Sequence, residues 1–266
     1  MATLASSVRH AAWPLAAPIA ARTVGLISAG AWGLSVAFEV TGHAGAFHHY
    51  ALIQGVPGSP PPPLWLAVPV FLLAWQLMIG AMMLPASVRA VGAAELVARF
   101  GGRPIVAIAG FLGAYAVAWT GFGLVGFLGD VRLHDFVHAT PWLAERPWLV
   151  QAASLAVAGL YQLVPSRRRA LEACRHPRSL GARSTGDARV GFRLGLAHAA
   201  DCLASSWALM LLMFAAGFAN LAWMAILAAV MAYEALGRHG ARFGIGVGVV
   251  LLGLSGVATT GVVLGF

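Results

Sequence analysis

Long apolar stretches recur along the chain, and short segments carrying most of the charged residues separate them. A membrane-spanning helix needs about 20 predominantly apolar residues. Stretches near this length lie at residues 23–41, 64–86, 104–128, 148–165, 194–215, 219–236 and 243–264. The pattern therefore predicts an all-α fold, a polytopic transmembrane helix bundle of about seven spans. We expect a cytoplasmic N-terminal tail at residues 1–22 and one transmembrane domain at residues 23–266.

The composition agrees with this interpretation. Hydrophobic residues make up 60% of the chain and charged residues 10%, and the mean hydropathy is +0.81. Soluble domains have about 25% charged residues. The chain is therefore expected to be embedded in a lipid bilayer, with no room left for a separate soluble domain.

The basic residues are all arginines, 17 in number, and the net charge is +8. Such a charge can indicate nucleic-acid binding, but cytoplasmic loops of membrane proteins also collect basic residues. With the N-terminus in the cytoplasm, all the arginines except Arg132 and Arg146 fall on the inner side of the predicted spans. The arginines thus predict a cytoplasmic N-terminus and an outer C-terminus, and no nucleic-acid partner.

The fifth predicted span contains the unusually polar stretch "HAADCLASSWALM". Its polar residues follow the spacing i, i+3, i+4 and i+7, which corresponds to one helix face; they are His198, Asp201, Cys202 and Ser205. An ionisable group at bilayer depth is costly and usually faces a protein interior. We therefore expect this face to point into the bundle.

Other spans offer groups that could join this face. Glu234 lies at the inner end of the sixth span, and Met78 and Met82 share a face of the second span. Thiolate and thioether sulfur select Cu(I), and imidazole suits zinc and copper. One hypothesis is a copper or zinc site formed by Cys202, Asp201, His198, Glu234, Met78 and Met82. The alternative is that the polar groups join helices through hydrogen bonds while the methionines fill the core.

Histidines also gather in the two predicted outer loops. His43, His48 and His49 lie in the first loop, and His134 and His138 lie in the second. Because both loops are expected on the same side of the membrane, these imidazoles could form a second metal site that captures a cation. A solvated pair of loops with chance clustering of histidines remains the alternative.

The chain has two cysteines. Cys174 falls in a predicted inner loop and Cys202 within a span. We expect them in different environments, and a reducing cytosol also argues against a structural disulfide.

Several segments, in order along residues 65–257, resemble a known family. They are "WQLMIGAMMLP", "YAVAWTGFGLVGF", "AGLYQLVPSRRRALEACRHP", "CLASSWALMLLMFAAGFANLAWMAILAAVMAYE" and the glycine-rich last span. The resemblance is to the bacterial predicted metal-binding integral membrane proteins, a domain family of unknown function. It implies a multi-pass protein of the bacterial inner membrane that binds a metal ion.

The chain departs from that family pattern at informative positions. In the fifth span, Cys202 matches the first family cysteine, but Ser205 and Ser206 replace a cysteine pair. In the inner loop, Cys174 matches one of two cysteines and Ala170 replaces the other. Because a hydroxyl is a poor ligand for a soft metal, these departures weaken the implied site.

Four classes of function remain open. The sequence favours metal handling, with a non-catalytic accessory or structural subunit of a membrane complex as the alternative, followed by a small-solute transporter and a membrane enzyme. A nucleophile with a base and an oxyanion site cannot be assembled from the sequence, so we expect no catalytic residues.

Overall fold

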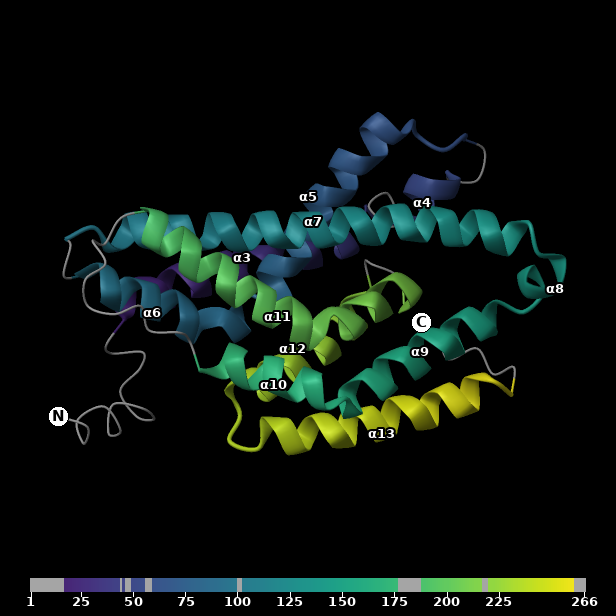
Figure 1. The fold of residues 1–266 in the computed structure, drawn as a ribbon. Helices are drawn as coiled ribbons and strands as arrows, with labels where there is room; N and C mark the ends of the chain where they lie inside the picture. The colour runs from purple at the N-terminus through teal and green to yellow at the C-terminus, as the bar shows by residue number, and fades with distance from the viewer. Residues whose placement is uncertain are drawn as a thin grey trace.

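The computed structural model describes residues 17–43, 45, 49–55, 59–99, 102–176, 188–216 and 220–260, without the side chains of residues 49 and 216. These residues form helices and no strands, which confirms the predicted all-α fold (Figure 1). A helix occurs at each stretch that was predicted to span the membrane. These helices are α3 (Pro18–Val40), α5 (Leu64–Met82), α7 (Pro104–His138), α9 (Pro147–Leu163), α11 (Ala188–Ala216), α12 (Leu221–Leu236) and α13 (Gly240–Ala258).

Shorter helices connect the long ones. They are α4 (His49–Gln54), the 3-10 turn η2 (Pro85–Ser87), α6 (Val88–Arg99), α8 (Pro141–Ala144) and α10 (Pro165–Arg175). Among the described residues, α3, α5, α7, α11 and α13 are long and apolar enough to cross a membrane. The helix pair α9 and α10 meets the same criterion only together, across a bend of 70°, and α12 is shorter. Within the described part of the chain, five or six helices, rather than seven, therefore have the length and composition of a span.

Proline sets the bend between α9 and α10. A residue that precedes proline is pushed out of the helical region of backbone conformation, and Val164 is extended with ψ of 130°. Pro165 then occupies the first turn of α10, where its missing N–H costs nothing. As a result α10 turns away from the axis of α9 and packs against α11 and α12 (Figure 1).

Glycines allow the central helices α7 and α11 to approach closely. A Cβ atom added to Gly191 would lie 2.0 Å from the carbonyl oxygen of Ala107, and one added to Gly195 would lie 2.4 Å from that of Phe111. Both distances are shorter than any real contact, so only glycine fits at these positions. This spacing of four residues is a GxxxG pattern, which favours close helix packing. It fixes the side of α11 that faces α7.

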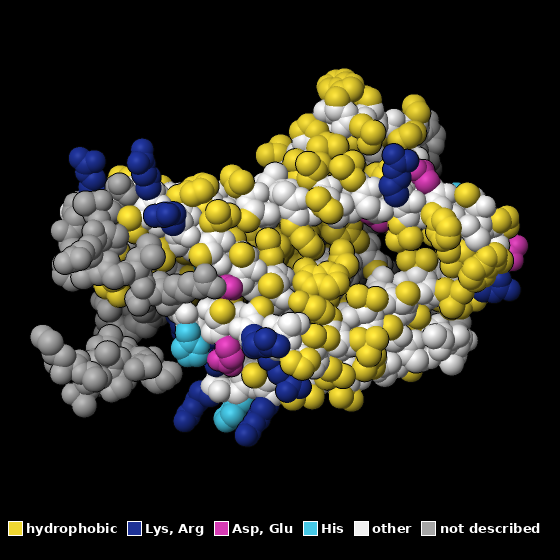
Figure 2. All heavy atoms as spheres, viewed as in Figure 1, with side chains coloured by type: hydrophobic (Ala, Val, Ile, Leu, Met, Phe, Trp, Pro, Cys, Tyr) yellow, Lys and Arg dark blue, Asp and Glu magenta, His cyan; other side chains and the backbone are white. Residues whose placement is uncertain are grey.

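Much of the outer surface is apolar. Figure 2 shows hydrophobic side chains over the long helices. Leu26, Leu73 and Val125 are each more than 70% exposed. Apolar surface of this extent marks contact with lipid or with other proteins.

Candidate metal centre

The predicted polar face of α11 lies inside the bundle. His198, Cys202 and Ser205 are all buried, at spacings of four and three residues. The next residue after Ser205, Ser206, is buried too, whereas Asp201 is only half-buried. The expectation that this face points inward is thus correct for the imidazole and the thiol.

Helix α10 brings a second thiol to this face. Its buried residues Arg167, Leu171 and Cys174 have spacings of four and three residues, so they share one face of the helix. That face packs against α11. Cys174 is 7% exposed and Cys202 is 3% exposed, and neither forms a disulfide.

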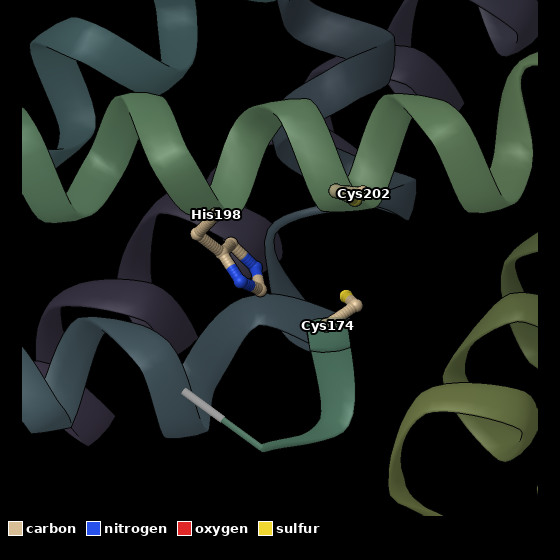
Figure 3. Close-up of side chains that lie close together, drawn as sticks. All are labelled: Cys174, His198 and Cys202. Carbon is tan, nitrogen blue, oxygen red and sulfur yellow. The ribbon is translucent and has the colours of Figure 1, made fainter. Parts of the chain in front are cut away.

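Together with His198, the two thiols form a compact cluster (Figure 3). One ligand atom from each of Cys174, His198 and Cys202 lies within 4.8 Å of the other two. With metal–ligand bonds of 2.0–2.3 Å, the ligand atoms of a tetrahedral site lie roughly 3.3–3.8 Å apart. Side-chain rotation could shorten the separations between the three ligand atoms by about 1 Å. The three atoms would then be spaced to bind one ion.

A second layer of side chains orients this cluster. The hydroxyl of Ser87 lies 3.1 Å from Nε2 of His198 and donates to the hydroxyl of Tyr115 at 3.2 Å. The Tyr115 hydroxyl in turn lies 3.4 Å from the sulfur of Cys202. The rings of Phe111 and Tyr115 pack against the imidazole at centroid distances of 5.7 and 6.0 Å. Such outer contacts hold metal ligands in orientation and raise affinity.

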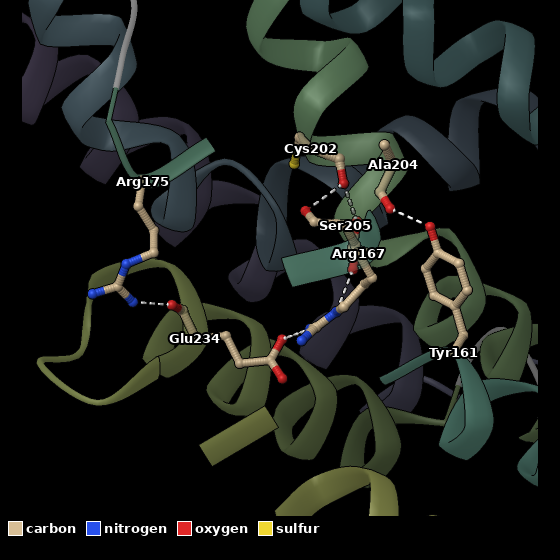
Figure 4. A network of polar contacts seen from close by, with 8 residues as sticks. Tyr161, Arg167, Arg175, Cys202, Ala204, Ser205 and Glu234 are labelled. Carbon is tan, nitrogen blue, oxygen red and sulfur yellow. Dashed lines mark hydrogen bonds and ion pairs between the residues drawn. The ribbon is translucent and has the colours of Figure 1, made fainter. Parts of the chain in front are cut away.

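A buried ion pair holds α10 in place (Figure 4). Nη2 of Arg167 donates to the carboxylate of Glu234 on α12, and both side chains are almost completely buried. Nε of Arg167 donates to the carbonyl of Ser205 at 3.0 Å. At the other end of α10, Arg175 donates to the carbonyls of Glu234 and Gly237 near the end of α12. Two arginines thus fix the helix that carries Cys174.

These contacts also show what the remaining polar candidates do. Glu234 accepts from Arg167, so its carboxylate lies in an ion pair outside the cluster. The hydroxyls of Ser205 and Ser206 donate to the Cys202 carbonyl, at 2.9 and 2.7 Å. The half-buried Asp201 lines a small hollow that His198 also lines. The two serines are therefore bound to their own helix.

The methionines Met78 and Met82 are buried on one face of α5, with Trp75. Helix α5 packs against α3, α7 and α12. It meets α11 through Phe214, whose ring lies 5.5 Å from that of Trp75. Phe214 is three turns beyond Cys202, and both methionines belong to the hydrophobic core of the bundle.

The sequence matches the family model described as PpoB2, copper chaperone, over residues 72–258. The chain belongs to the PpoB2 copper chaperone family. The matched segment runs from within α5 to the end of α13 and contains Cys174, His198 and Cys202. The resemblance to a metal-binding family is thereby supported, with copper as the metal. No match was found among curated proteins or among solved structures.

For this PpoB2 chain, the expected separation of the two cysteines is wrong. The density of arginines suggested a solvated inner loop, but residues 165–175 form a helix that folds back onto α11. Two signals in the sequence indicate a buried face on this helix, but neither identifies α11 as the helix that covers it. Leu171 and Cys174 form an apolar face next to Pro165, and Cys174 matches a family cysteine.

The outer histidines are only partly described. His43 is exposed, His48 lies outside the described residues and the side chain of His49 is not described. His134 and His138 lie at the end of α7, where helix α4 meets them. Tyr50 packs edge-on against His134 at 4.9 Å, and the side-chain nitrogen of Gln54 lies 3.2 Å from His138 Nε2. The two outer segments therefore do come together.

Proposed function

We propose that the protein is a multi-pass copper chaperone of the bacterial inner membrane, which holds one Cu(I) ion between Cys174, Cys202 and His198. The observation that carries this proposal is the compact cluster of two buried thiols and an imidazole in a chain of a copper chaperone family. Thiolate sulfur is the ligand type that selects Cu(I) over harder cations.

The number of ligands suits an ion that must be passed on. Structural zinc sites are usually closed by four protein ligands, whereas sites that exchange a ligand keep a position open. A site of two thiolates and one imidazole leaves room for a ligand from an acceptor protein. The bound ion would then be exchanged directly between proteins, without release into water.

The membrane location rests on the apolar helices and on the arginine distribution. The exposed apolar side chains of the long helices suit a lipid environment, and lipid together with partner membrane subunits accounts for the exposed surface. We propose a cytoplasmic N-terminus and an outer C-terminus. A periplasmic reporter fused after residue 183, in a segment outside the described residues, is expected to be inactive. An active fusion would contradict this orientation.

Metal competition tests the proposed site. The full chain, purified in detergent under reducing conditions, is titrated with Cu(I) against a chromogenic Cu(I) chelator. We expect one tightly bound ion per chain. Cys174→Ser, Cys202→Ser and His198→Ala should each weaken binding at least tenfold, and the double cysteine variant should abolish it.

A matched control is the exposed histidine at the end of α10. His176 is 68% exposed and contacts Glu172 on its own helix, so His176→Ala should leave Cu(I) binding unchanged. Wild-type affinity in the Cys174→Ser variant would overturn the assignment of this cysteine. Unchanged binding in the double cysteine variant would overturn the site as a whole.

A further inference from the structure

A large cavity lies at the end of the molecule away from α10. It has a volume of about 1380 Å³ and is lined by α3, α4, α7, α8, α9, the second half of α11 and the start of α12. Figure 1 shows α8 joining the ends of α7 and α9, which move apart with distance from α8, and Figure 2 shows the surface hollowed in this region. A cavity of this size exceeds the usual range for small-ligand sites, about 300–1,000 Å³. It is therefore large enough to admit a hydrated ion or a metal-carrying group.

The charge of this cavity is opposite to that of the chain. The net charge is +8 and the chain has 17 arginines, yet no arginine is among the described residues that line the cavity. Its titratable lining residues are Glu39, Tyr50, Asp130, His134 and His138. Carboxylates in a concave, partly apolar site concentrate cations. The cavity is thus electrostatically suited to a cation.

Within the lining, one face of α7 carries Asp130, His134 and His138 at intervals of four residues. Nδ1 of His134 lies 2.9 Å from the backbone oxygen of Asp130 and 3.4 Å from its carboxylate. A carbonyl oxygen only accepts hydrogen bonds, so Nδ1 carries the hydrogen. The metal-binding lone pair is then on Nε2. An imidazole whose second nitrogen donates to a carbonyl or carboxylate is the usual arrangement of a histidine that binds a metal.

The second histidine differs, because its contact is on Nε2. The amide nitrogen of Gln54 lies 3.2 Å from Nε2 of His138. An amide nitrogen only donates, so Nε2 holds a lone pair that accepts from Gln54, and a cation bound there would replace this hydrogen bond. Because His134 and His138 are one turn apart, their Cβ atoms are about 5–6 Å from each other, which is a suitable spacing for two ligands of one ion.

We propose that this cavity contains a second metal site, in which His134 and His138 bind a divalent transition-metal cation of borderline hardness, Cu(II) or Zn(II), and Asp130 orients His134. Imidazole suits these cations, whereas the inner thiol pair selects Cu(I). Of the histidines suggested by the sequence, two are assigned here. Asp130 and Gln54 are additions that only the structure reveals.

The position of the cavity connects the two sites. Trp207 of α11 lines the cavity and lies five residues beyond Cys202, about 7.5 Å further along the helix axis. The cavity that contains the proposed outer site therefore reaches α11 close to Cys202, and an ion leaving that site toward the thiols would follow α11. This relation rests on the proposed copper function, but binding of a divalent cation by the two histidines does not.

Calorimetric titration of the full chain with Zn(II) tests the outer site. The Cys174→Ser/Cys202→Ser variant serves as background, because it removes the thiols that would bind Zn(II) elsewhere. We expect one Zn(II) per chain. Adding Asp130→Asn should weaken binding about tenfold, and adding His134→Ala or His138→Ala should weaken it further.

The control variant is again His176→Ala. His176 has the same contacts to an acidic residue one turn earlier, with Nδ1 3.0 Å from the carbonyl of Glu172 and 3.5 Å from its carboxylate, but both side chains are exposed. It should leave Zn(II) binding unchanged. No Zn(II) binding, or equal binding after His134→Ala, would overturn the proposal. A loss of Zn(II) binding in His176→Ala equal to that in His134→Ala would also overturn it.

A second measurement covers the case in which the double cysteine variant does not fold. Co(II) bound to thiolate gives a charge-transfer absorption that Co(II) bound only to imidazole and oxygen lacks. In the wild-type cysteine background, His134→Ala should remove one equivalent of Co(II) and leave this absorption intact. If the protein with wild-type cysteines shows no thiolate absorption but still binds Co(II) that His134→Ala removes, the outer site stands. The inner site, and with it the proposed function, has then failed.

Discussion

Arg167 on α10 forms a buried ion pair with Glu234 on α12, 67 residues away in the sequence. The same guanidinium donates to the carbonyl of Ser205, which is three residues beyond Cys202 on α11. One side chain therefore joins the helix that carries Cys174 to the helix that carries the other two proposed ligands.

The first prediction concerns this pair. Glu234→Ala should destabilise the protein by about 3–5 kcal/mol, because it leaves the Arg167 charge buried without its partner. Thermal unfolding in detergent measures the effect. The double variant Arg167→Met/Glu234→Ala should recover much of the loss, since neither charge then remains buried. Glu172→Ala, which removes an exposed carboxylate of α10, should change stability by less than about 0.5 kcal/mol. A double variant as unstable as Glu234→Ala would contradict this account.

A second prediction concerns Gly244 on α13, which lies against the ion pair. A Cβ atom at this position would lie 2.6 Å from Nη1 of Arg167 and 2.9 Å from Oε1 of Glu234. Gly244→Ala should therefore displace the pair, lower the unfolding temperature and weaken Cu(I) binding by moving α10. At Gly246 a Cβ meets nothing within 4 Å, so Gly246→Ala serves as the matched control. Equal effects of the two substitutions would show that the close contact is unimportant.

Local spacing explains why part of this centre was predictable from the sequence. The polar positions of the fifth predicted span repeat with helical period, and their burial was expected because polar groups on a membrane-spanning helix are costly to expose to lipid. His198 and Cys202 are indeed buried. The seven apolar stretches likewise predicted helices that are present. Periodicity and hydropathy carry this information because each depends on neighbouring residues only.

The contribution of Cys174 depends on contacts between distant residues. Its helix is rich in arginine, a composition typical of solvated inner loops. Burial of Arg167 becomes possible only because Glu234 supplies the opposite charge and Ser205 a carbonyl acceptor. No local pattern specifies those partners, so the fold of α10 onto α11 could not be derived. The same holds for Tyr50 and Gln54, which meet α7 across a long connection.

The third prediction uses the proximity of the two thiols. Their sulfur atoms lie within 4.8 Å of each other, so diamide, a thiol oxidant, should convert them into a disulfide and take up the two electrons and two protons. The oxidised protein should lose both maleimide-reactive thiols and Cu(I) binding, and dithiothreitol should restore them. The Cys174→Ser variant should instead keep its remaining thiol after mild treatment. Unchanged labelling of the wild-type chain would place the cysteines too far apart for a shared ion.

The last prediction follows from the protons that a metal displaces. Cu(I) binds thiolates, so each thiol ligand that is protonated in the metal-free protein releases one proton on binding. Below the thiol pKa values, the apparent affinity of the wild-type chain should rise by up to roughly a hundredfold per pH unit. A single-cysteine variant should show a rise of at most about tenfold per unit. Competition titrations between pH 6 and 8 distinguish the two slopes, with His176→Ala expected to follow the wild type. Equal slopes in the wild-type and single-cysteine proteins would mean that only one sulfur binds the ion, and the pairing of Cys174 with Cys202 as ligands would then be wrong.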